Sequence, residues 1–79
     1  MKVEVHLFAT LVSYLPDEAA GDGVILDVPE GTTVADLVRV LMIPEDLDCL
    51  RVVNGHDAPS DHRLAAGDVL TLFPPLAGG

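Results

Sequence analysis

The stretch Pro29-Glu-Gly-Thr-Thr-Val-Ala-Asp-Leu-Val-Arg-Val-Leu41 has the pattern of a turn followed by an amphipathic helix. Its first three residues are typical of a turn. Thr32 or Thr33 then supplies an N-cap, and with Thr33 in that role Asp36 takes the place of the acidic partner in a capping box. The next apolar residues follow at helical spacing: Val34, Leu37, Val38 and Leu41. Because Pro44 stops the pattern, the sequence predicts one principal helix over about residues 33–42.

Apolar segments on both sides of this helix have the alternation of β-strands. They cover residues 2–8, 24–28, 50–53 and 69–73, with a short edge strand around Asp57–Pro59 as a fifth member. The first two suit an antiparallel hairpin whose long connection holds a short helix or helical turn over residues 9–15. The expected fold class is therefore α+β, a mixed sheet of 4–5 strands covered by one helix.

The last strand carries apolar residues in both of its phases. We assign Leu70 and Leu72 to the core and Phe73 to the outer face, because Phe73 leads into the segment that follows. Phe8 continues the polar phase of the first strand, so its ring is expected on the wetter face and near Phe73. Exposed apolar patches mark interfaces, so Phe8 and Phe73 are predicted to bind a partner.

Composition and charge limit the functions open to the protein. Of its 79 residues 49% are hydrophobic, which is enough for a core without metal or disulfide support. Thirteen acidic residues against four basic ones give a net charge of −9, which disfavours nucleic-acid binding. No apolar run approaches the roughly 20 residues that span a bilayer, and the first residues lack the pattern of a signal peptide. We expect neither nucleic-acid nor membrane partners.

The final residues, 74–79, are expected to form a thin tail beyond a domain of residues 1–73. Pro74 and Pro75 end the last strand, since neither can donate a backbone hydrogen bond. Six residues reach about 20 Å at roughly 3.3 Å each. Gly78 and Gly79 have no Cβ, so a narrow channel in another protein can close around them. We interpret the Gly79 carboxyl as the reactive group and expect other proteins to supply the catalysis.

Four segments together resemble a known family, the ubiquitin-like β-grasp sulfur carriers of the MoaD/ThiS type. They are Pro29-Glu30-Gly31-Thr32-Thr33, Val52-Val53-Asn54-Gly55, the turn Gly67-Asp68, and Leu72-Phe73-Pro74-Pro75-Leu76-Ala77-Gly78-Gly79. The resemblance runs over the whole chain. The Phe-Pro-Pro sequence and the extra segment Ala9–Gly23 make it more similar to the small subunit of molybdopterin synthase than to the thiamine-biosynthesis carrier.

The resemblance implies a carrier protein that is not itself an enzyme and binds no cofactor. A partner adenylyltransferase, similar to ubiquitin-activating enzymes, would use ATP and magnesium to join AMP to the Gly79 carboxyl. A persulfide donor would then replace AMP and leave a thiocarboxylate. An acceptor such as a molybdopterin synthase large subunit, in a heterotetramer of two copies each, would take the sulfur in the cytoplasm. The partner-binding residues would be Phe8, Phe73, Pro74, Pro75, Leu76 and Ala77, with Gly78 beside the reactive end.

Other readings of the chain stay open at this point. The same tail suits a sulfur carrier for thiamine thiazole or another sulfur metabolite, a modifier that joins Gly79 to a target lysine, or a plain binding module. The chain has no Walker-type phosphate loop and no basic cluster to hold ATP, so activation has to come from outside. A lone cysteine, Cys49, is expected as a small core residue and fits a reducing compartment.

The three histidines of the chain suggest no metal site. His6, His56 and His62 lack metal-ligand spacing with a supporting Cys or Glu. His56 and His62 are expected in solvated loops.

Overall fold

The computed structural model of the chain describes residues 1–16, 21, 23–44, 47 and 49–74. Its elements follow the order β1 (Lys2–Leu7), a 3₁₀ helix η1 (Ala9–Tyr14), β2 (Gly23–Asp27), α1 (Val34–Val40), β3 (Leu50–Val53), β4 (His56–Asp57) and β5 (Val69–Phe73). The predicted strands, the single principal helix and the helical turn after the first strand are all confirmed. Residues 17–20 and 22, in the connection between η1 and β2, lie outside the described residues.

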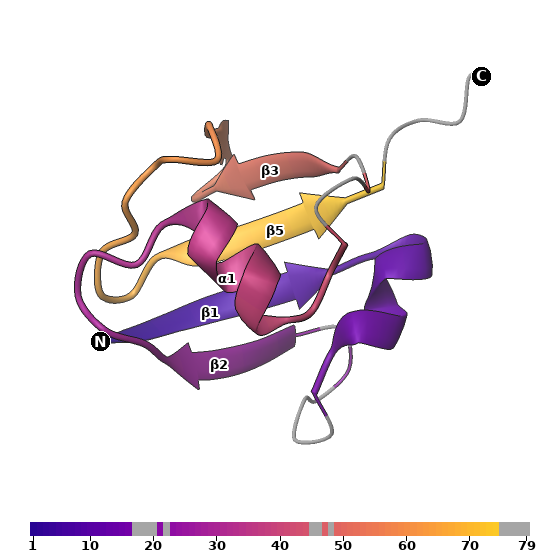
Figure 1. Cartoon of the computed structure of the whole chain (residues 1–79), viewed down its shortest axis with the longest axis horizontal. Helices are drawn as coiled ribbons and strands as arrows, with labels where there is room; N and C mark the ends of the chain where they lie inside the picture. Colours follow the sequence, from indigo (N-terminus) through magenta and orange to yellow (C-terminus); the bar gives the residue numbers. More distant parts are fainter. Residues whose placement is uncertain (17–20, 22, 45–46, 48, 75–79) are drawn as a thin grey trace.

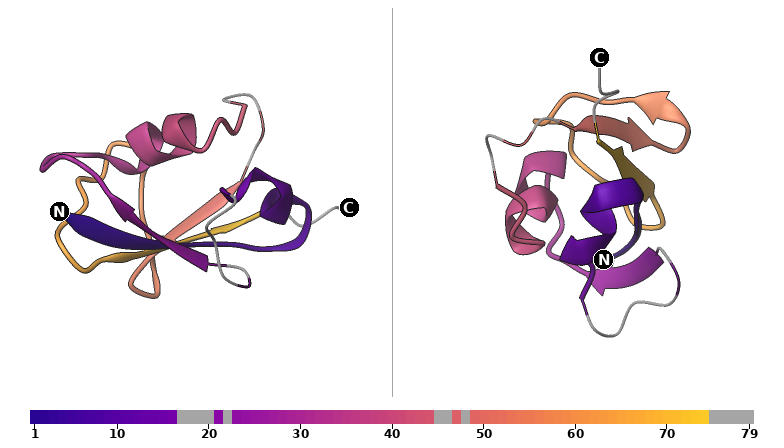
Figure 2. Two further views of the ribbon diagram at one scale, coloured as in Figure 1. Left: turned by 90° about the horizontal axis from the view of Figure 1, so that it is seen from below. Right: turned by 90° about the vertical axis from the view of Figure 1, so that its right-hand side faces the viewer.

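One five-stranded mixed sheet has the order β2-β1-β5-β3-β4. The first and last strands of the chain, β1 and β5, lie side by side and parallel at its centre, while the other pairs are antiparallel. The helix α1 lies across one face of this sheet, and no helix of the described residues covers the other face (Figures 1 and 2). We call the uncovered side the open face.

The core lies between the sheet and α1, and the period-two pattern of the strands explains its composition. Val3, Val5 and Leu7 of β1 are fully buried, as are Leu70 and Leu72 of β5. They pack with apolar residues of the helix side, namely Val34, Leu37 and Leu11. The prediction that Leu70 and Leu72 point into the core is therefore confirmed. Phe73 then points to the opposite face, because side chains alternate along a strand.

The start of α1 follows the sequence prediction in detail. Thr33 is the N-cap, and its hydroxyl accepts a hydrogen bond from the Asp36 backbone N–H at 3.1 Å. The Asp36 carboxylate in turn accepts from the Thr33 N–H at 3.0 Å, which completes the capping box. This backbone bond, together with the Thr33 hydroxyl and nearby Arg39, holds the pKa of the Asp36 carboxyl below its ordinary value.

The helix ends earlier than the predicted residue 42. Met42 has a left-handed backbone with φ of 62°, so it lies outside the helix. Its N–H donates to the Arg39 carbonyl, and the Ile43 N–H donates to the Val38 carbonyl, which is the Schellman pattern. Met42 thus occupies the position at which glycine is the usual residue.

The boundaries of three strands also differ from the sequence prediction, and β1 ends at Leu7 rather than at residue 8. The fifth strand is His56–Asp57 rather than a segment around Asp57–Pro59. Asn54 and Gly55 both adopt positive φ, and this two-residue turn starts the return strand at once. Strand β2 begins at Gly23, one residue early.

In the described part of the chain, no helix is long and apolar enough to cross a membrane.

Candidate functional site

The end of β5 meets the end of β1 through two aromatic rings. Phe8 and Phe73 are stacked, with ring centroids 5.1 Å apart and planes at 9°. The Phe8 N–H donates to the Leu72 carbonyl at 3.2 Å, which fixes the backbones that carry the two rings. The sequence prediction that Phe73 lies on the outer face with Phe8 nearby is therefore confirmed.

A third apolar residue extends this aromatic pair across the sheet. Leu50 of β3 is the direct cross-strand partner of Phe73, so its side chain lies on the same face. Leu50 is 50% exposed and Phe73 is 37% exposed, which leaves a continuous apolar surface at one end of the open face. We name Phe8, Leu50 and Phe73 the aromatic patch. Leu50 is a member that the sequence analysis missed, because only the strand register shows it.

The aromatic patch lies at the point where the chain leaves the sheet. Pro74 follows Phe73 directly and is half-buried. The remaining predicted site residues, Pro75, Leu76, Ala77, Gly78 and Gly79, lie outside the described residues. Their predicted roles, and the boundary between domain and tail, remain predictions.

Polar side chains occupy the middle of the open face. The His6 imidazole pairs with the Glu4 carboxylate on the same strand. The His6 ring lies over Gly23 of β2, where an added Cβ would come within 2.6 Å of the ring carbon Cε1. Gly23 therefore makes room for His6.

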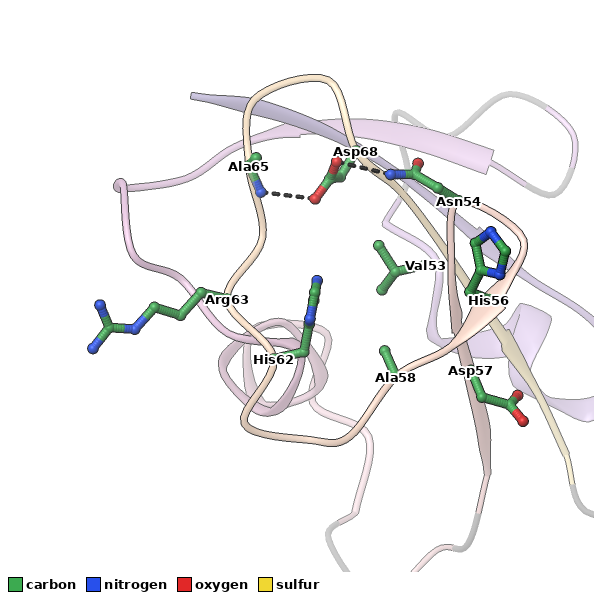
Figure 3. Close-up of a pocket in the computed structure, with 9 residues that line it drawn as sticks. All are labelled: Val53, Asn54, His56, Asp57, Ala58, His62, Arg63, Ala65 and Asp68. Carbon is green, nitrogen blue, oxygen red and sulfur yellow. Dashed lines mark hydrogen bonds between the residues drawn. The ribbon is translucent and has the colours of Figure 1, made fainter.

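A hydrogen-bonded cluster holds the opposite end of β5. The Asn54 amide donates to the Asp68 carboxylate at 2.9 Å, and its oxygen accepts from the Val69 N–H at 2.9 Å. The Ala65 N–H donates to the other Asp68 oxygen at 2.8 Å (Figure 3). These bonds, that from Ala65 above all, hold the pKa of the Asp68 carboxyl below its ordinary value. We name Asn54, Ala65, Asp68 and Val69 the polar clasp.

An open hollow of about 390 Å³ lies beside the polar clasp. His62 and His56 both line this hollow; His62 is half-buried, and His56 is exposed and belongs to β4 (Figure 3). The expectation that His56 lies in a loop is thus wrong, because the Asn54-Gly55 turn brings His56 into strand β4, in register with Val53. Among the described residues, no group of three or more His, Cys, Asp or Glu has the arrangement of a metal site.

Two more side chains lie near the tail end of the sheet on the helix side. Arg51 pairs in register with Leu72, and its Nη1 donates to the Cys49 carbonyl at 3.5 Å. The Arg51 Nε is buried and has no hydrogen-bond partner in the described structure. Cys49 is half-buried and packs against the core, as expected of a small apolar residue.

Comparison with known proteins agrees with this arrangement. The family model of the ThiS family matches residues 5–79, nearly the whole chain. The chain belongs to the ThiS family. The MoaD/ThiS resemblance and the ubiquitin-like β-grasp fold expected from it are thereby confirmed. Members of the ThiS family are small carrier subunits rather than catalysts.

Solved structures of similar fold come from carriers and from modifiers. SAMP1 from Haloferax volcanii is 30% identical, with a TM-score of 0.75 over 100% of both chains. A protein described as molybdopterin converting factor subunit 1 from Pyrococcus furiosus is also 30% identical, with a TM-score of 0.74 over 95% of this chain and 98% of its own. A chain in the complex of subunits 1 and 2 of molybdopterin-converting factor from Helicobacter pylori is 25% identical, with a TM-score of 0.62 over 100% of both chains. A search of curated proteins found no significant match.

Proposed function

We propose that this member of the ThiS family is a sulfur carrier for molybdopterin synthesis, with the Gly79 carboxylate as its working group. The observation that carries the proposal is the family match through residue 79, which ends on Gly78-Gly79. The aromatic patch supports it, because an exposed apolar surface lies where the tail begins.

The chemistry at Gly79 requires three steps. A carboxylate is a poor electrophile, so a partner adenylyltransferase first transfers AMP from magnesium-bound ATP to the carboxylate oxygen and releases pyrophosphate. The terminal sulfur of a persulfide then attacks the carbonyl carbon, and AMP leaves with the former carboxylate oxygen. The product is an acyl disulfide; a thiol then attacks the donor's sulfur, forms a new disulfide with it and frees the thiocarboxylate. Because the protein supplies only the carboxylate and its presentation, it binds no cofactor itself.

The aromatic patch is the proposed docking surface for the partners. Phe73 and Leu50 are exposed in the free protein, and covering them removes apolar area from water at about 25 cal/mol per Å². Stacking on Phe8 holds the Phe73 ring in one orientation before a partner arrives, which lowers the entropy cost of docking. Pro74, Pro75, Leu76 and Ala77 then continue from this surface toward the partner's active site.

The proposed acceptor is a molybdopterin synthase large subunit. The similar Helicobacter pylori chain comes from a complex of subunits 1 and 2 of molybdopterin-converting factor, and the Pyrococcus furiosus protein is described as subunit 1. By analogy, we propose a heterotetramer of two carriers and two large subunits in the cytoplasm, where ATP is at hand. A carrier for thiamine thiazole or another metabolite would undergo the same steps with a different acceptor.

Intact-mass measurement tests the proposal. The protein is incubated with its adenylyltransferase, magnesium, ATP, a persulfide donor and a thiol, and conversion of oxygen to sulfur should raise the mass by about 16 Da. A variant that lacks Gly79 serves as the control and should stay unchanged. An unchanged mass of the full chain in the complete mixture would contradict the proposal. Co-purification with the large subunit then separates molybdopterin synthesis from other acceptors.

A second candidate function is that of a protein modifier. It is favoured by the similarity to SAMP1 and to the small archaeal modifier protein 1 of Haloferax volcanii. Adenylation of Gly79 would then be followed by attack of a lysine amine on a target protein. Slower-migrating conjugates on a denaturing gel that disappear when Gly79 is deleted would support the modifier function, and a mass shift without conjugates would support the carrier.

A further inference from the structure

The Arg51 side chain carries more hydrogen-bond donors than the described structure satisfies. Its Nε is buried without a partner, and Nη1 donates only to the Cys49 carbonyl at 3.5 Å, the outer limit of a hydrogen bond. Nη2 makes no hydrogen bond with the described residues and is not buried, so a partner can reach it. A guanidinium has N–H groups on each of its nitrogens, and the described residues use few of those of Arg51.

Arg51 lies close to the point where the chain leaves the sheet. It is the second residue of β3 and pairs in register with Leu72, the residue before Phe73. Strand β3 begins where β5 ends, at the end of the sheet from which the tail leaves (Figure 1). Because side chains alternate along a strand, Arg51 shares the helix side with buried Val53, while Leu50 faces the other way. The guanidinium and the aromatic patch therefore flank the same strand ends from opposite faces of the sheet.

The other basic side chains of the chain lie elsewhere or are already paired. The chain has four Lys and Arg residues, all of which the structure describes. Lys2 is at the start of β1, opposite to the tail, and Arg63 lines the hollow beside the polar clasp. Arg39 pairs with the Asp36 carboxylate on α1. In a protein with a net charge of −9, Arg51 is therefore a local positive site beside the tail that attracts a carboxylate.

The burial of Nε makes this arginine better suited to an ion pair than a fully exposed one. Part of the cost of removing the guanidinium from water has already been met by the fold, so covering the rest of the group costs less. Attraction to a carboxylate increases as the surrounding dielectric constant falls. A carboxylate that approaches Nη2 adds a charge-assisted hydrogen bond, which is stronger than a bond to water or to a neutral acceptor.

We propose that Arg51 is a specificity-determining residue of docking, whose guanidinium pairs with an aspartate or glutamate of the adenylyltransferase. The pairing rests on the proposed function, since it requires activation of Gly79, a step that the carrier and the modifier share. A partner channel that surrounds the chain just beyond Pro74 has walls on both faces of the sheet. One wall covers the aromatic patch, and the other presents the carboxylate to Arg51. The apolar contact supplies affinity, and the ion pair selects a partner with an acidic residue at this point.

Kinetics of tail activation with the full chain and its adenylyltransferase test the proposal. Exchange of pyrophosphate with ATP follows adenylation alone and is measured against the concentration of the protein. Arg51→Gln should raise the KM for the protein about tenfold and leave kcat within about twofold, because it removes a docking contact and not the reacting carboxyl. Arg51→Lys keeps the charge and should recover part of the loss. An unchanged KM in Arg51→Gln, or a fall in kcat alone, would overturn the proposal.

Arg63→Gln is the matched control. It removes the same charge beside the polar clasp, at the other end of β5, and should leave the KM within about twofold of the unchanged protein. Equal increases of KM in Arg51→Gln and Arg63→Gln would show that net charge rather than the position of Arg51 governs docking, and would overturn the proposal.

Ionic strength gives a readout that a merely structural role of Arg51 would not produce. Raising the salt concentration from about 0.05 to 0.5 M should increase the KM of the unchanged protein more steeply than that of Arg51→Gln, which lacks the screened pair. The melting temperature of Arg51→Gln should stay within a few degrees of the unchanged protein, because Nε loses no partner. Equal salt dependence of the two proteins would contradict the ion pair.

The outcomes separate this pairing from the carrier function. Exchange that depends on Arg51, without a mass increase in the complete sulfur-transfer mixture, would support the pairing and contradict the carrier function. A normal mass increase together with a KM that does not depend on Arg51 would overturn the pairing alone. Absence of exchange with the unchanged protein would overturn both.

Discussion

The two ends of β5 differ in every respect that matters for function. At its start, the polar clasp joins Asn54, Asp68 and Val69 by hydrogen bonds of 2.9 Å. At its end, Phe73 stacks on Phe8 and stays partly exposed. Both ends belong to segments that mark the chain as a member of its family. One end therefore shapes the fold, while the other presents a surface to partners.

The difference follows from what each end has to satisfy. The half-buried Asp68 carboxylate needs partners, since an unmet hydrogen bond of a buried group costs about 1–3 kcal/mol. The polar clasp meets this need within the chain. An exposed aromatic surface makes no such demand, and its apolar area becomes useful only when another protein covers it. Six predictions are ordered from the largest expected effect to the smallest, and the first three test this division between the two ends of β5.

Deletion of Gly79 should abolish the mass increase of about 16 Da completely while leaving the fold intact. The reason is that the reactive carbonyl would move to a shorter tail, whereas the core of β1, β5 and α1 is unchanged. Intact mass and circular dichroism check the two halves of this expectation. If the shortened variant still gains sulfur, the carboxyl of Gly79 is not required for the reaction.

Phe73→Glu should slow activation of the tail by about tenfold or more, because a charge replaces the centre of the aromatic patch. Ile25→Glu is the matched control. Ile25 is 64% exposed on the same open face, but it lies on β2, away from the tail. The rate of the mass shift with the adenylyltransferase is the measurement. Similar losses in both variants would show that charge on the open face, rather than the patch, governs docking.

Asp68→Ala should lower the free energy of unfolding by about 2 kcal/mol, since it removes the acceptor of two hydrogen bonds. It should leave the rate of tail activation unchanged, because the polar clasp lies at the other end of β5. Urea unfolding and the mass-shift assay check these statements. A large effect on activation would break the division between the two ends.

The same clasp predicts a pH dependence of stability. Hydrogen bonds from Ala65 and Asn54 lower the pKa of Asp68 in the folded protein below its ordinary value of 3.8. The ionised form therefore stabilises the fold above that value, and this stabilisation is lost as the pH falls through the lowered pKa. Unfolding at pH values between about 2 and 6 should show a decline below pH 4 that is smaller in Asp68→Asn.

Gly23→Ala should destabilise the fold by about 1–2 kcal/mol, because its Cβ would meet the His6 ring at 2.6 Å. The ring would have to leave its place beside Glu4. The double variant His6→Ala, Gly23→Ala should recover most of the loss, since the clash is removed. Denaturant unfolding of the two single variants and the double variant measures this coupling. Purely additive effects would contradict the assigned contact.

Met42→Gly should raise the free energy of unfolding by about 0.5–1 kcal/mol, the smallest of these effects. The backbone φ of 62° is unstrained for glycine and strained for methionine. Thermal unfolding with Val40→Gly as the control checks it. Val40 lies in the last turn of α1, so glycine should destabilise the helix there.

Local signals in the sequence predicted most of the elements. The capping box of Thr33 and Asp36, the Asn54-Gly55 turn and the period-two strands all depend on residues close together in the chain. The errors in the predicted element boundaries also arise because the prediction used only residues close together in the chain. Nothing near Met42 in the sequence shows that it adopts a left-handed conformation, so the predicted helix end came out too late.

The candidate site was predicted in part. The phase of Leu70, Leu72 and Phe73 was available from the pattern of the last strand together with the segment that follows. Leu50 was missed, because its neighbour Phe73 is known only from the strand register. The roles assigned to residues 75–79 still rest on the family resemblance and on the chemistry of a terminal carboxylate.

The sequence by itself determined the period of each segment, the start of the single helix and the unusual final residues, because these depend on side-chain size, backbone freedom and local hydrogen bonds. Only the tertiary structure decided which distant residues meet. It stacks Phe8 on Phe73, ties Asn54 to Asp68, and sets Leu26 beside Val40 and Met42. The physical reason is that strand order and register come from the packing of the whole core, which no local pattern encodes.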